Sequence, residues 1–446
     1  MFEVQWKAGD VTWLPFDQVL SQSVIAYETR EKVGGIWLPS PPVVDDYNAP
    51  VTALYDSLTT NVPHPIMAYT SYSFPPETPL FPSAHVVQTY LESYAAYFNL
   101  MPLIKFDTAV LDARWESTQW IVTLSDGGHF AYDHLIVTNG HYHLPRIPEL
   151  PGLADWMKRG RASHSAWYRK PDFLGDKILV VGGGPSGEHI ATEIDPENLI
   201  RRGRLIELKA NGQALFDDGT TEDNIDYCIL ATGFCMHFPF LEEASMIINN
   251  IPPDFPPLLP GKLFNSTYHV FPLAKRLFPL QSPYPISSIA FMGLLIKVVP
   301  FPLMEAQAYA IVRTFSDPSS LDPIAETVDI ITHSDKIKRA GASTPLAVAK
   351  AWIRFDGQDQ WDYRNAMYQF AQGMGSGTPL IKVTEWEKEL YGLKVDLRSG
   401  WEDLEKSGDS IAWLRDVGKN GVQDWVELMY RVLDYARTPK DSLGKL

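Results

Sequence analysis

Cysteine is nearly absent from this sequence of 446 residues, which contains only Cys228 and Cys235. Two cysteines are too few for a disulfide framework or a zinc ribbon, and this usage is typical of a reducing, cytoplasmic compartment. We interpret both as ordinary buried residues, because an expected strand and turn separate them. The histidines His64, His141 and His143 lack acids or cysteines at metal-ligand spacing, so we expect no metal site.

Long apolar runs are also missing. The longest, residues 286–304, is interrupted by Lys297, Pro300 and Pro302, which predicts a buried strand and loop rather than a transmembrane segment. The N-terminus, MFEVQWKAGD, lacks the profile of a signal peptide. Basic residues number 38 against 54 acidic ones, and the net charge of −16 disfavours nucleic acid and anionic membranes as partners. We therefore expect a soluble protein.

The remaining composition is that of a folded protein with more than one domain. Hydrophobic residues make up 45% of the chain and charged residues 21%, which excludes wholesale disorder. A length of 446 residues allows two or three domains, or one domain inserted into another.

A glycine fingerprint occupies the middle of the chain. KILVV, residues 177–181, predicts a buried parallel strand, and helix-spaced residues follow the glycines. In the GxGxxG pattern, Gly182 permits a tight turn, Gly184 lets a pyrophosphate approach the backbone, and Gly187 lets the helix pack on the strand. The helix N-terminus offers free N–H groups to phosphate. The sequence therefore predicts a nucleotide site here.

The strand that should follow this fingerprint and read the ribose is shortened or absent. A Rossmann unit places such a strand, ending in an acid or an arginine, about 20 residues after the first glycine. Here RLIELK, residues 204–209, instead predicts a hairpin with QALF, residues 213–216, around an Asn-Gly turn. Three nearby arginines are within reach of a 2′-phosphate but are better interpreted as a solvated cluster: Arg201, Arg202 and Arg204.

Segments upstream of the fingerprint carry a second set of cofactor-type residues. VIAYETREKVGGIW, residues 24–37, predicts a strand that ends in Glu28 and is followed by a glycine loop. An acid at that position accepts hydrogen bonds from ribose hydroxyls in Rossmann units. Taken alone, Glu28 is better interpreted as a solvated strand end. Two strand-plus-glycine segments follow, VTNGHY at 137–142 and LATGF at 230–234.

In their order, these motifs resemble the flavin-containing monooxygenases, which use FAD and NADPH. The signature of that family is a glycine, a histidine four residues later and a tyrosine four beyond. Gly160, His164 and Tyr168 match it, with Lys158 where an aromatic residue is expected. The resemblance runs from about residue 24 to residue 307. We interpret His164 as a structural hydrogen bonder rather than a catalyst.

The resemblance implies an α/β fold with two Rossmann-like nucleotide-binding domains. The FAD-binding domain would be discontinuous, at residues 1–170 and 234–446. A shortened NADP-binding domain, at residues 171–233, would be inserted in it. Helix-spaced apolar residues in 401–436 predict C-terminal helices that cover the FAD domain or shape a substrate channel. A homodimer is left open.

The resemblance also implies roles for individual residues. Asn61, in the family's Thr-Asn element, would be the catalytic residue beside the reactive edge of the flavin. The FAD site would use Glu28, Gly34, Gly35, Ile36, Trp37, Thr60, Asn61 and Val62. The NADPH site would use Gly182, Gly184, Ser186, Gly187, Glu188 and His189. Two glycines in the segments that link the domains complete the set, Gly140 and Gly233. His64 stands where the family often has a lysine.

One family motif is missing. The first nucleotide site of the family is a strand, a GxGxxG turn and a helix, yet residues 1–23 contain a single glycine, Gly9. Residues 13–22 would keep the remains of that helix. Each lost charge-assisted hydrogen bond costs about 1.5–3 kcal/mol, so losing about three of them weakens FAD binding by several orders of magnitude. The chain is then either an incomplete version of its gene product or a degenerate family member.

The implied function is oxygenation of a soft nucleophile, an amine nitrogen or sulfide sulfur of a small molecule, with FAD, NADPH and O2. Two enzymatic alternatives stay open because Lys158 departs from the signature: a Baeyer–Villiger and an N-hydroxylating monooxygenase. A third alternative is a catalytically impaired remnant, a scaffold or NADP(H)-binding protein that lacks tightly bound FAD. A dehydrogenase with one cofactor would leave Glu28, Trp37 and Asn61 unexplained.

Overall fold

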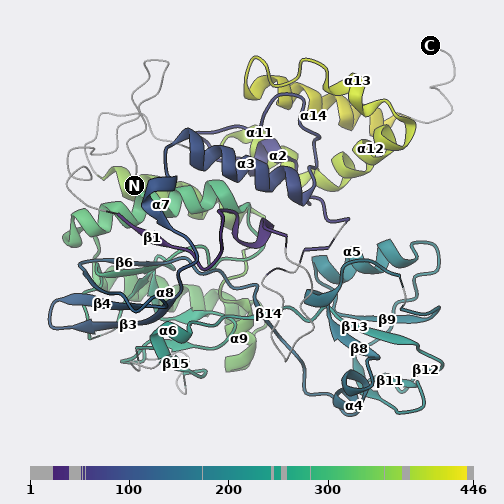
Figure 1. Cartoon of the computed structure of the whole chain (residues 1–446), viewed down its shortest axis with the longest axis horizontal. Helices are drawn as coiled ribbons and strands as arrows, with labels where there is room; N and C mark the ends of the chain where they lie inside the picture. The colour runs from purple at the N-terminus through teal and green to yellow at the C-terminus, as the bar shows by residue number, and fades with distance from the viewer. Residues whose placement is uncertain are drawn as a thin grey trace. The chain divides into compact units, whose positions relative to one another are not determined.

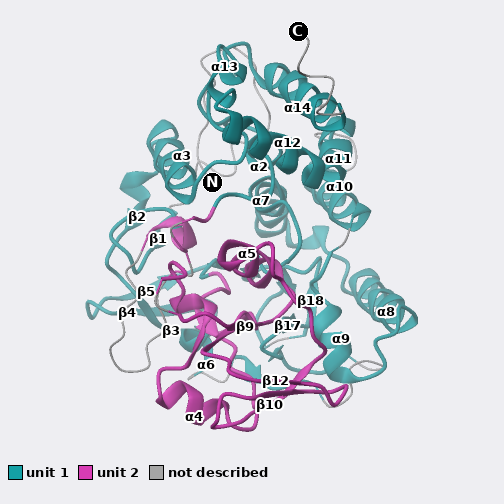
Figure 2. Ribbon diagram, turned by 90° about the vertical axis from the view of Figure 1, so that its right-hand side faces the viewer, with its two compact units in different colours: residues 1–34, 59–139, 238–446 teal, residues 35–58, 140–237 magenta. Residues whose placement is uncertain are grey.

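The computed structural model describes most of the chain after residue 23 (Figure 1). The described residues are 24–39, 52, 54–55, 57–172, 174–242, 246–252, 259–281, 283–355, 357–373 and 382–438. The helix remnant predicted at residues 13–22 lies outside them. The described residues form two compact units (Figure 2). Unit 1 takes its residues from Met1–Gly34, Thr59–Asn139 and Phe238–Leu446, and unit 2 from Gly35–Leu58 and Gly140–His237.

Unit 2 is built on a parallel sheet of three strands in the order β8, β13, β9, which span Ala162–His164, Tyr227–Leu230 and Ile178–Val181. The middle strand, β13, is fully buried along its aliphatic residues, and Ile229 is 1% exposed. β9 continues through the glycine turn into α5, Pro185–Ile194. Ile190 of α5 packs on Ile229, so the helix covers one face of the sheet. This is the strand, turn and helix that the fingerprint predicts.

The predicted hairpin is also confirmed. β10 (Leu205–Leu208) pairs antiparallel with β11 (Ala214–Phe216), and β12 (Thr221–Glu222) adds a third strand. α4 (Leu153–Lys158) packs against β8 and β10, with Trp156 buried beside them. On the far side of β9, no described strand pairs with it, since the sheet ends there. The missing ribose strand is therefore a structural feature of the described part of unit 2.

The cysteines of unit 2 differ from their prediction in one respect. Cys228 lies on β13 and is fully buried, and burial raises its pKa to about 12. Cys235 lies on β14 (Phe234–Cys235), which pairs antiparallel with β7 (Leu144–Pro145). Cys235 is only half-buried, which corrects the expectation of two buried cysteines. The reason is that this two-residue ladder has no further strand on its other side among the described residues.

Unit 1 contains several short sheets. β1 (Ala26–Tyr27) pairs in parallel with β2 (Ile104–Lys105), and β6 (Leu135–Val137) pairs in parallel with β20 (Ile289–Phe291). An antiparallel sheet consists of β3, β4 and β5, at Val110–Glu116, Gln119–Leu124 and His129–Tyr132. The remaining short strands are β15 to β19, at Ile248–Asn249, Phe264–Asn265, Val270–Phe271, Leu273–Ala274 and Phe278–Pro279.

Helices make up most of the rest of unit 1. The helices before residue 300 are α2 (His64–Met67), α3 (Ala84–Tyr97) and α6 (Pro239–Glu242), and the C-terminal ones are α7 to α14, at Pro300–Ser316, Pro323–Arg339, Pro345–Ala351, Gln358–Gln372, Glu385–Gly392, Lys394–Ser407, Ser410–Leu414 and Val422–Arg437. Single 3₁₀ turns of unit 1 are η2 (Met101–Leu103) and η4 (Pro318–Ser320), and those of unit 2 are η1 (Gly35–Trp37) and η3 (Ser165–Trp167). Within the described ranges, none of the helices has the length and apolar character needed to cross a bilayer.

The predicted C-terminal helices are confirmed, and one predicted loop is wrong. Residues 300–304 belong to α7, which begins at Pro300. Proline is favoured at the first position of a helix, where its missing N–H costs nothing, so it starts this helix rather than breaking it. Helices α11 to α14 gather beside α2 (Figures 1 and 2). The ring of Trp425 on α14 lies 4.3 Å from the ring of His64 on α2.

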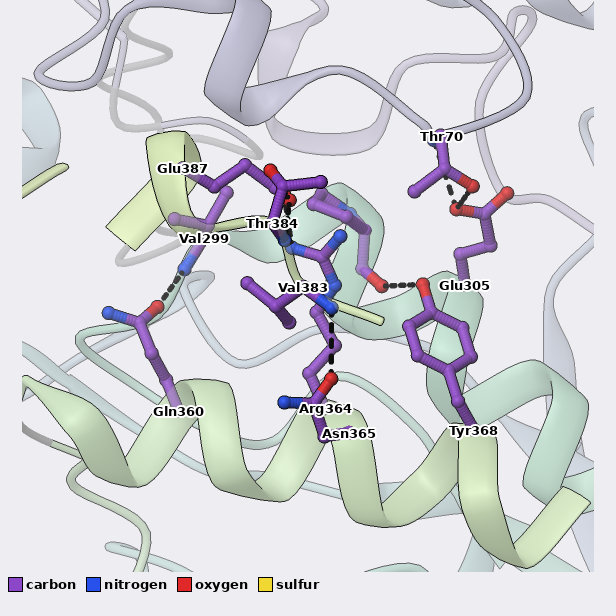
Figure 3. Close-up of polar contacts among 11 residues, drawn as sticks. Thr70, Val299, Glu305, Gln360, Arg364, Asn365, Tyr368, Val383, Thr384 and Glu387 are labelled. Atoms are coloured by element: carbon purple, nitrogen blue, oxygen red, sulfur yellow. Dashed lines mark hydrogen bonds and ion pairs between the residues drawn. The ribbon is translucent and has the colours of Figure 1, made fainter. Parts of the chain in front are cut away.

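A buried polar network joins α10 to other helices of unit 1 (Figure 3). Gln360 accepts a hydrogen bond from the backbone N–H of Val299, at 2.9 Å, just before α7. Arg364 Nη1 donates to Glu387 Oε1 of α11 at 2.8 Å. Arg364 and Glu387 are 2% and 7% exposed, so both charges are desolvated. The other carboxylate oxygen of Glu387 accepts from the N–H of Thr384, which caps α11. The pair thus fixes both the packing and the start of α11.

We expect Arg364→Leu to lower the free energy of unfolding by about 3–5 kcal/mol, because it leaves the Glu387 carboxylate buried without its cation. Chemical denaturation monitored by circular dichroism measures the change. The control is Lys336→Met, which breaks a pair with Asp359 whose side chains are 64% and 44% exposed. That change should cost less than about 1 kcal/mol. Equal losses in the two variants would contradict the assignment of a buried, structural ion pair.

Buried or half-buried histidines in both units have lowered pKa values. Desolvation lowers the pKa of His64 and His269 to about 3, and that of His141, His164 and His333 to about 4, from an ordinary value of 6.5. A histidine whose pKa is lower in the folded chain favours folding most when it is neutral. Its contribution is complete above pH 6.5 and is lost as the pH falls toward 4.

The free energy of unfolding should therefore decrease from pH 7 to pH 5, by about 1.4 kcal/mol for each proton that the unfolded chain takes up per pH unit. Denaturant titrations at pH 7, 6 and 5 measure this slope. His64 packs between Phe74 and Trp425, at ring distances of 4.8 and 4.3 Å. His64→Phe keeps an aromatic ring there and removes the titration, so its slope should be shallower. A slope that His64→Phe leaves unchanged would show that this histidine does not titrate in that range.

Candidate functional site

The glycine turn after β9 passes close to a neighbouring strand. Gly182 has a φ of +124°, and a Cβ at that position would lie 2.2 Å from the carbonyl oxygen of Ala231. A Cβ at Gly187 would lie 2.0 Å from the carbonyl oxygen of Gly182. Both positions therefore require glycine, the first for the turn and the second for the close contact between helix and turn.

Gly184 differs from these two glycines because the space at its Cβ position is empty. Its φ is −86°, and a Cβ there would meet no atom of the described chain within 4 Å. α5 begins at the next residue, Pro185, and no side chain caps its N-terminus. The first-turn N–H groups of Ser186 and Gly187 have no acceptor among the described hydrogen bonds, so they are available to an anion. This arrangement fits a dinucleotide pyrophosphate.

Other residues near this turn are distributed as follows. Glu188 is exposed, and half-buried His189 lies with its ring 5.2 Å from that of Tyr55. Of the three arginines that follow, Arg202 is held by Glu222 through its Nε, at 2.7 Å. All three are exposed, which agrees with a solvated basic cluster.

His164, the histidine of the family signature, contacts the backbone of the strand end beside the glycine turn. His164 is 0% exposed at the end of β8. Its Nε2 lies 2.9 Å from the carbonyl oxygen of Gly233, and its Nδ1 accepts from the backbone N–H of Ala166 at 3.1 Å. Those contacts fit the neutral ring with the proton on Nε2, and burial keeps the pKa at about 4. The interpretation of His164 as a structural hydrogen bonder is confirmed.

The other signature residues also act on the framework. Gly160 has a φ of +67° and ends α4, since its N–H donates to the carbonyl of Met157 at 3.0 Å. The hydroxyl of Tyr168 donates to Glu193 Oε2 of α5 at 2.9 Å. The signature therefore links α4, β8 and α5 around the nucleotide turn. Sequence reasoning missed Glu193, which has no motif of its own.

Gly233 lies at the centre of these contacts. It has a φ of +80°, and its carbonyl accepts from the N–H of Arg146, at 2.9 Å, as well as from His164. The Thr232 hydroxyl donates to the carbonyl of Arg146 at 2.6 Å. Gly140, in the other linking segment, has a φ of +72° and open space at its Cβ position. Positive φ explains why both linking segments carry glycine.

In unit 1, Glu28 follows β1 as predicted. Its backbone N–H donates to the carbonyl of Lys105 at 3.0 Å, which keeps it at the end of the parallel pair. One carboxylate oxygen accepts from the N–H of Arg30 at 2.9 Å. The half-buried carboxylate retains capacity to accept hydrogen bonds from ribose hydroxyls.

Both glycines after Glu28 have a positive φ, which favours glycine, and that of Gly34 is +132°. A Cβ at Gly34 would lie 1.8 Å from the side-chain oxygen of Gln88, whose amide nitrogen donates to the carbonyl of Val33 at 2.6 Å. Gly35, the first residue of unit 2, has a φ of +54°. Ile36 is 40% exposed and Trp37 is half-buried, so both offer apolar surface to a ligand.

The Thr-Asn element lies in a segment of unit 1 that bends at Asn61 and Val62. Thr60 is 3% exposed, donates its N–H to the carbonyl of Pro82 at 3.0 Å, and donates its hydroxyl to the carbonyl of Val62 at 2.9 Å. Val62 is also buried, whereas Asn61 between them is exposed. The neutral, buried His64 that follows does not replace the positive charge of the family's lysine.

The structure thus brings the predicted NADPH residues together around one turn, and Thr60 to Val62 in one segment. Within unit 1, Glu28 has a carboxylate that fits a ribose, and within unit 2, Ile36 and Trp37 offer apolar surface. The turn that would hold the FAD pyrophosphate has no counterpart among the described residues. Within the same residues, no group of three or more His, Cys, Asp or Glu side chains is arranged to hold a metal ion.

Comparison with known proteins agrees with these features. The model of the flavin-binding monooxygenase-like family matches residues 20–198 and 197–356. The flavin-containing monooxygenase FMO GS-OX-like 4 of Arabidopsis thaliana is 27% identical over 442 residues, spanning 85% of this chain and 89% of that protein. The thiol-specific monooxygenase of Saccharomyces cerevisiae is 28% identical over 348 residues, spanning 70% and 76%.

The fold is shared with solved structures. That of the S-allyl-L-cysteine S-oxygenase from Allium sativum superimposes with a TM-score of 0.68 at 22% identity, covering 91% of this chain and 92% of that one. This likeness confirms the predicted α/β fold. Because the family model matches more than half of the chain, the protein belongs to the flavin-binding monooxygenase-like family.

Proposed function

We propose that the protein is an NADPH- and FAD-dependent monooxygenase that uses O2 to oxygenate a soft nucleophile, nitrogen or sulfur, of a small molecule. Membership of the family supports this reaction class. The observation that carries the proposal is the open glycine turn at the start of α5, which fits the pyrophosphate of NADPH. A sulfur substrate is the first to test, because a relative at 28% identity is a thiol-specific monooxygenase.

The NADP-binding domain is proposed at residues 171–233, and the FAD-binding domain at 1–170 and 234–446. The N–H groups of Ser186 and Gly187 would hold the NADPH pyrophosphate, and the Glu28 carboxylate would accept from the FAD ribose. When bound, the flavin would supply hydride acceptance and activation of dioxygen. Every other task falls to the protein: binding, orientation and the exclusion of water.

Asn61 is the proposed catalytic residue. Its carboxamide carries two N–H donors and one carbonyl acceptor and does not titrate, so it would orient polar groups without moving a proton. Its exposed position between two buried neighbours leaves the carboxamide available to a ligand. The rigid segment around it would limit where the carboxamide can lie.

A prediction for the NADPH site concerns Gly184→Ala. The free chain has room for this methyl group and an ordinary φ, so the variant should fold like the wild type. If the pyrophosphate approaches the backbone there, the methyl group blocks it, and the dissociation constant for NADPH should rise at least about tenfold. Titration calorimetry with NADPH measures it. Gly392→Ala, also open at its Cβ position, is the control and should bind normally. Unchanged affinity in Gly184→Ala would place the phosphate elsewhere.

The whole proposal is tested by the visible spectrum of the protein, reconstituted with FAD and then given NADPH without oxygen. A flavin band that stays with the protein through gel filtration and bleaches on NADPH addition would support it. Oxygen consumption with a sulfide, an amine or a cyclic ketone then separates the substrate classes. A protein that binds NADPH yet stays colourless after incubation with FAD would instead be an NADP(H)-binding protein without flavin.

A further inference from the structure

A residue of the C-terminal helices forms hydrogen bonds with the segment before Asn61. Arg398 of α12 donates from Nη1 to the backbone carbonyl of Thr60 at 2.7 Å. Its Nη2 donates to the hydroxyl oxygen of Thr59 at 2.8 Å. Thr60 and Thr59 precede Arg398 by 338 and 339 residues in the sequence. Two donors of one planar guanidinium therefore bind two consecutive residues, a geometry that a lysine cannot reproduce.

The guanidinium is itself held in place. Its Nε donates to Glu402 Oε1, one turn further along α12, at 2.7 Å. Its carbon lies 5.2 Å from the centre of the Phe81 ring. The side chain is 28% exposed, so its hydrogen bonds are partly shielded from water. All three nitrogens of the guanidinium are hydrogen-bonded and its carbon lies near an aromatic ring. The guanidinium therefore has little freedom to move.

Helix α12, which carries Arg398, packs closely against α14. At Gly400, α12 approaches α14 so closely that a Cβ would lie 3.0 Å from the carbonyl oxygen of Val432. Trp401 and Met429, on the two helices, are 1% and 0% exposed. α14 also places Trp425 against His64, three residues after Asn61. The C-terminal helices thus contact the Asn61 segment on both of its flanks.

The carbonyl of Thr60 belongs to the same planar peptide unit as the N–H of Asn61. Holding that oxygen fixes the plane from which the Asn61 backbone continues. On the other side, the N–H of Thr60 is bonded to Pro82, and Thr59 forms a bridge with Ser83. Arg398 adds two further hydrogen bonds to this frame. It lies beyond residue 356, where the match to the family model ends.

We propose that Arg398 is a positioning residue that orients Asn61 by clamping Thr59 and Thr60, and that its loss uncouples NADPH oxidation from oxygenation of the substrate. The second half of this inference rests on the proposed function. Without the clamp, the Asn61 carboxamide would sample several directions, and water would reach the reaction centre. NADPH would then still be oxidised with O2, but more of the oxygen would leave as hydrogen peroxide.

The test compares Arg398→Gln, Arg398→Lys and Thr59→Val with the wild type. Hydrogen exchange on the chain without cofactors is the first readout, at the amides of Thr60 and His64, which are bonded to Pro82 and Leu80. Arg398→Gln should raise their exchange rates about tenfold, the scale of a lost charge-assisted hydrogen bond. Arg398→Lys and Thr59→Val should give smaller increases. Arg431→Gln, which removes an arginine stacked 4.7 Å over Trp413, is the control and should change neither amide.

Hydrogen peroxide released per NADPH oxidised is the second readout, measured with a sulfide substrate on the FAD-reconstituted protein. Arg398→Gln should raise this ratio severalfold while the rate of anaerobic flavin reduction by NADPH stays within about twofold of wild type. Exchange rates that do not change overturn the clamp. Faster exchange with an unchanged peroxide ratio shows a purely structural contact and overturns the positioning role. A wild type that oxidises no NADPH overturns the proposed function and this role with it, whereas hydrogen exchange still decides the clamp.

Discussion

The nucleotide turn of unit 2 depends on one steric constraint, the close approach of the backbone at Gly182 to the carbonyl of Ala231. A side chain at position 182 would occupy the place of that carbonyl, and one at 187 would collide with the turn itself. The constraint reaches well beyond the glycines. Ala231 has to stay where it is, and the contacts of His164 and Arg146 with Gly233, two residues later, hold the end of β13 in place. The family signature therefore supports the elements around the nucleotide turn, although it lies before the turn in the sequence.

The features that the sequence predicted correctly have local causes. The β9 strand, its glycines and α5 specify one another within 18 residues, and the hairpin carries its own Asn-Gly turn. The structural role of His164 was predicted, but its acceptor, 69 residues away, was not. The beginning of α7 was predicted as a loop because prolines were counted as breakers, although the first position of a helix favours them. Cys235 was expected to be buried because the pattern does not show where a sheet ends.

Contacts between residues that are far apart in the sequence cannot be predicted from a local sequence pattern. Nothing in the sequence around Arg364 distinguishes it from a surface arginine, and its burial beside Glu387 follows from how α10 meets α11. The same is true of Arg398, whose partners Thr59 and Thr60 precede it by more than 300 residues. Helix-spaced apolar residues predicted helices in residues 401–436, which include the second half of α12, because such spacing depends on near neighbours. It could not show which polar residue on the other face would reach a particular carbonyl.

The link between Arg398 and Thr60 also bears on how the protein is made. Synthesis proceeds from the N-terminus at about 5–20 residues per second, so Thr60 leaves the ribosome well before Arg398 exists. Until α12 has been translated and packed, the Asn61 segment lacks one side of its frame. Closing so long a loop is also entropically costly and slow. The Asn61 segment would therefore reach its final geometry only late in folding. The glycine turn of unit 2 would form before the Asn61 segment is in place.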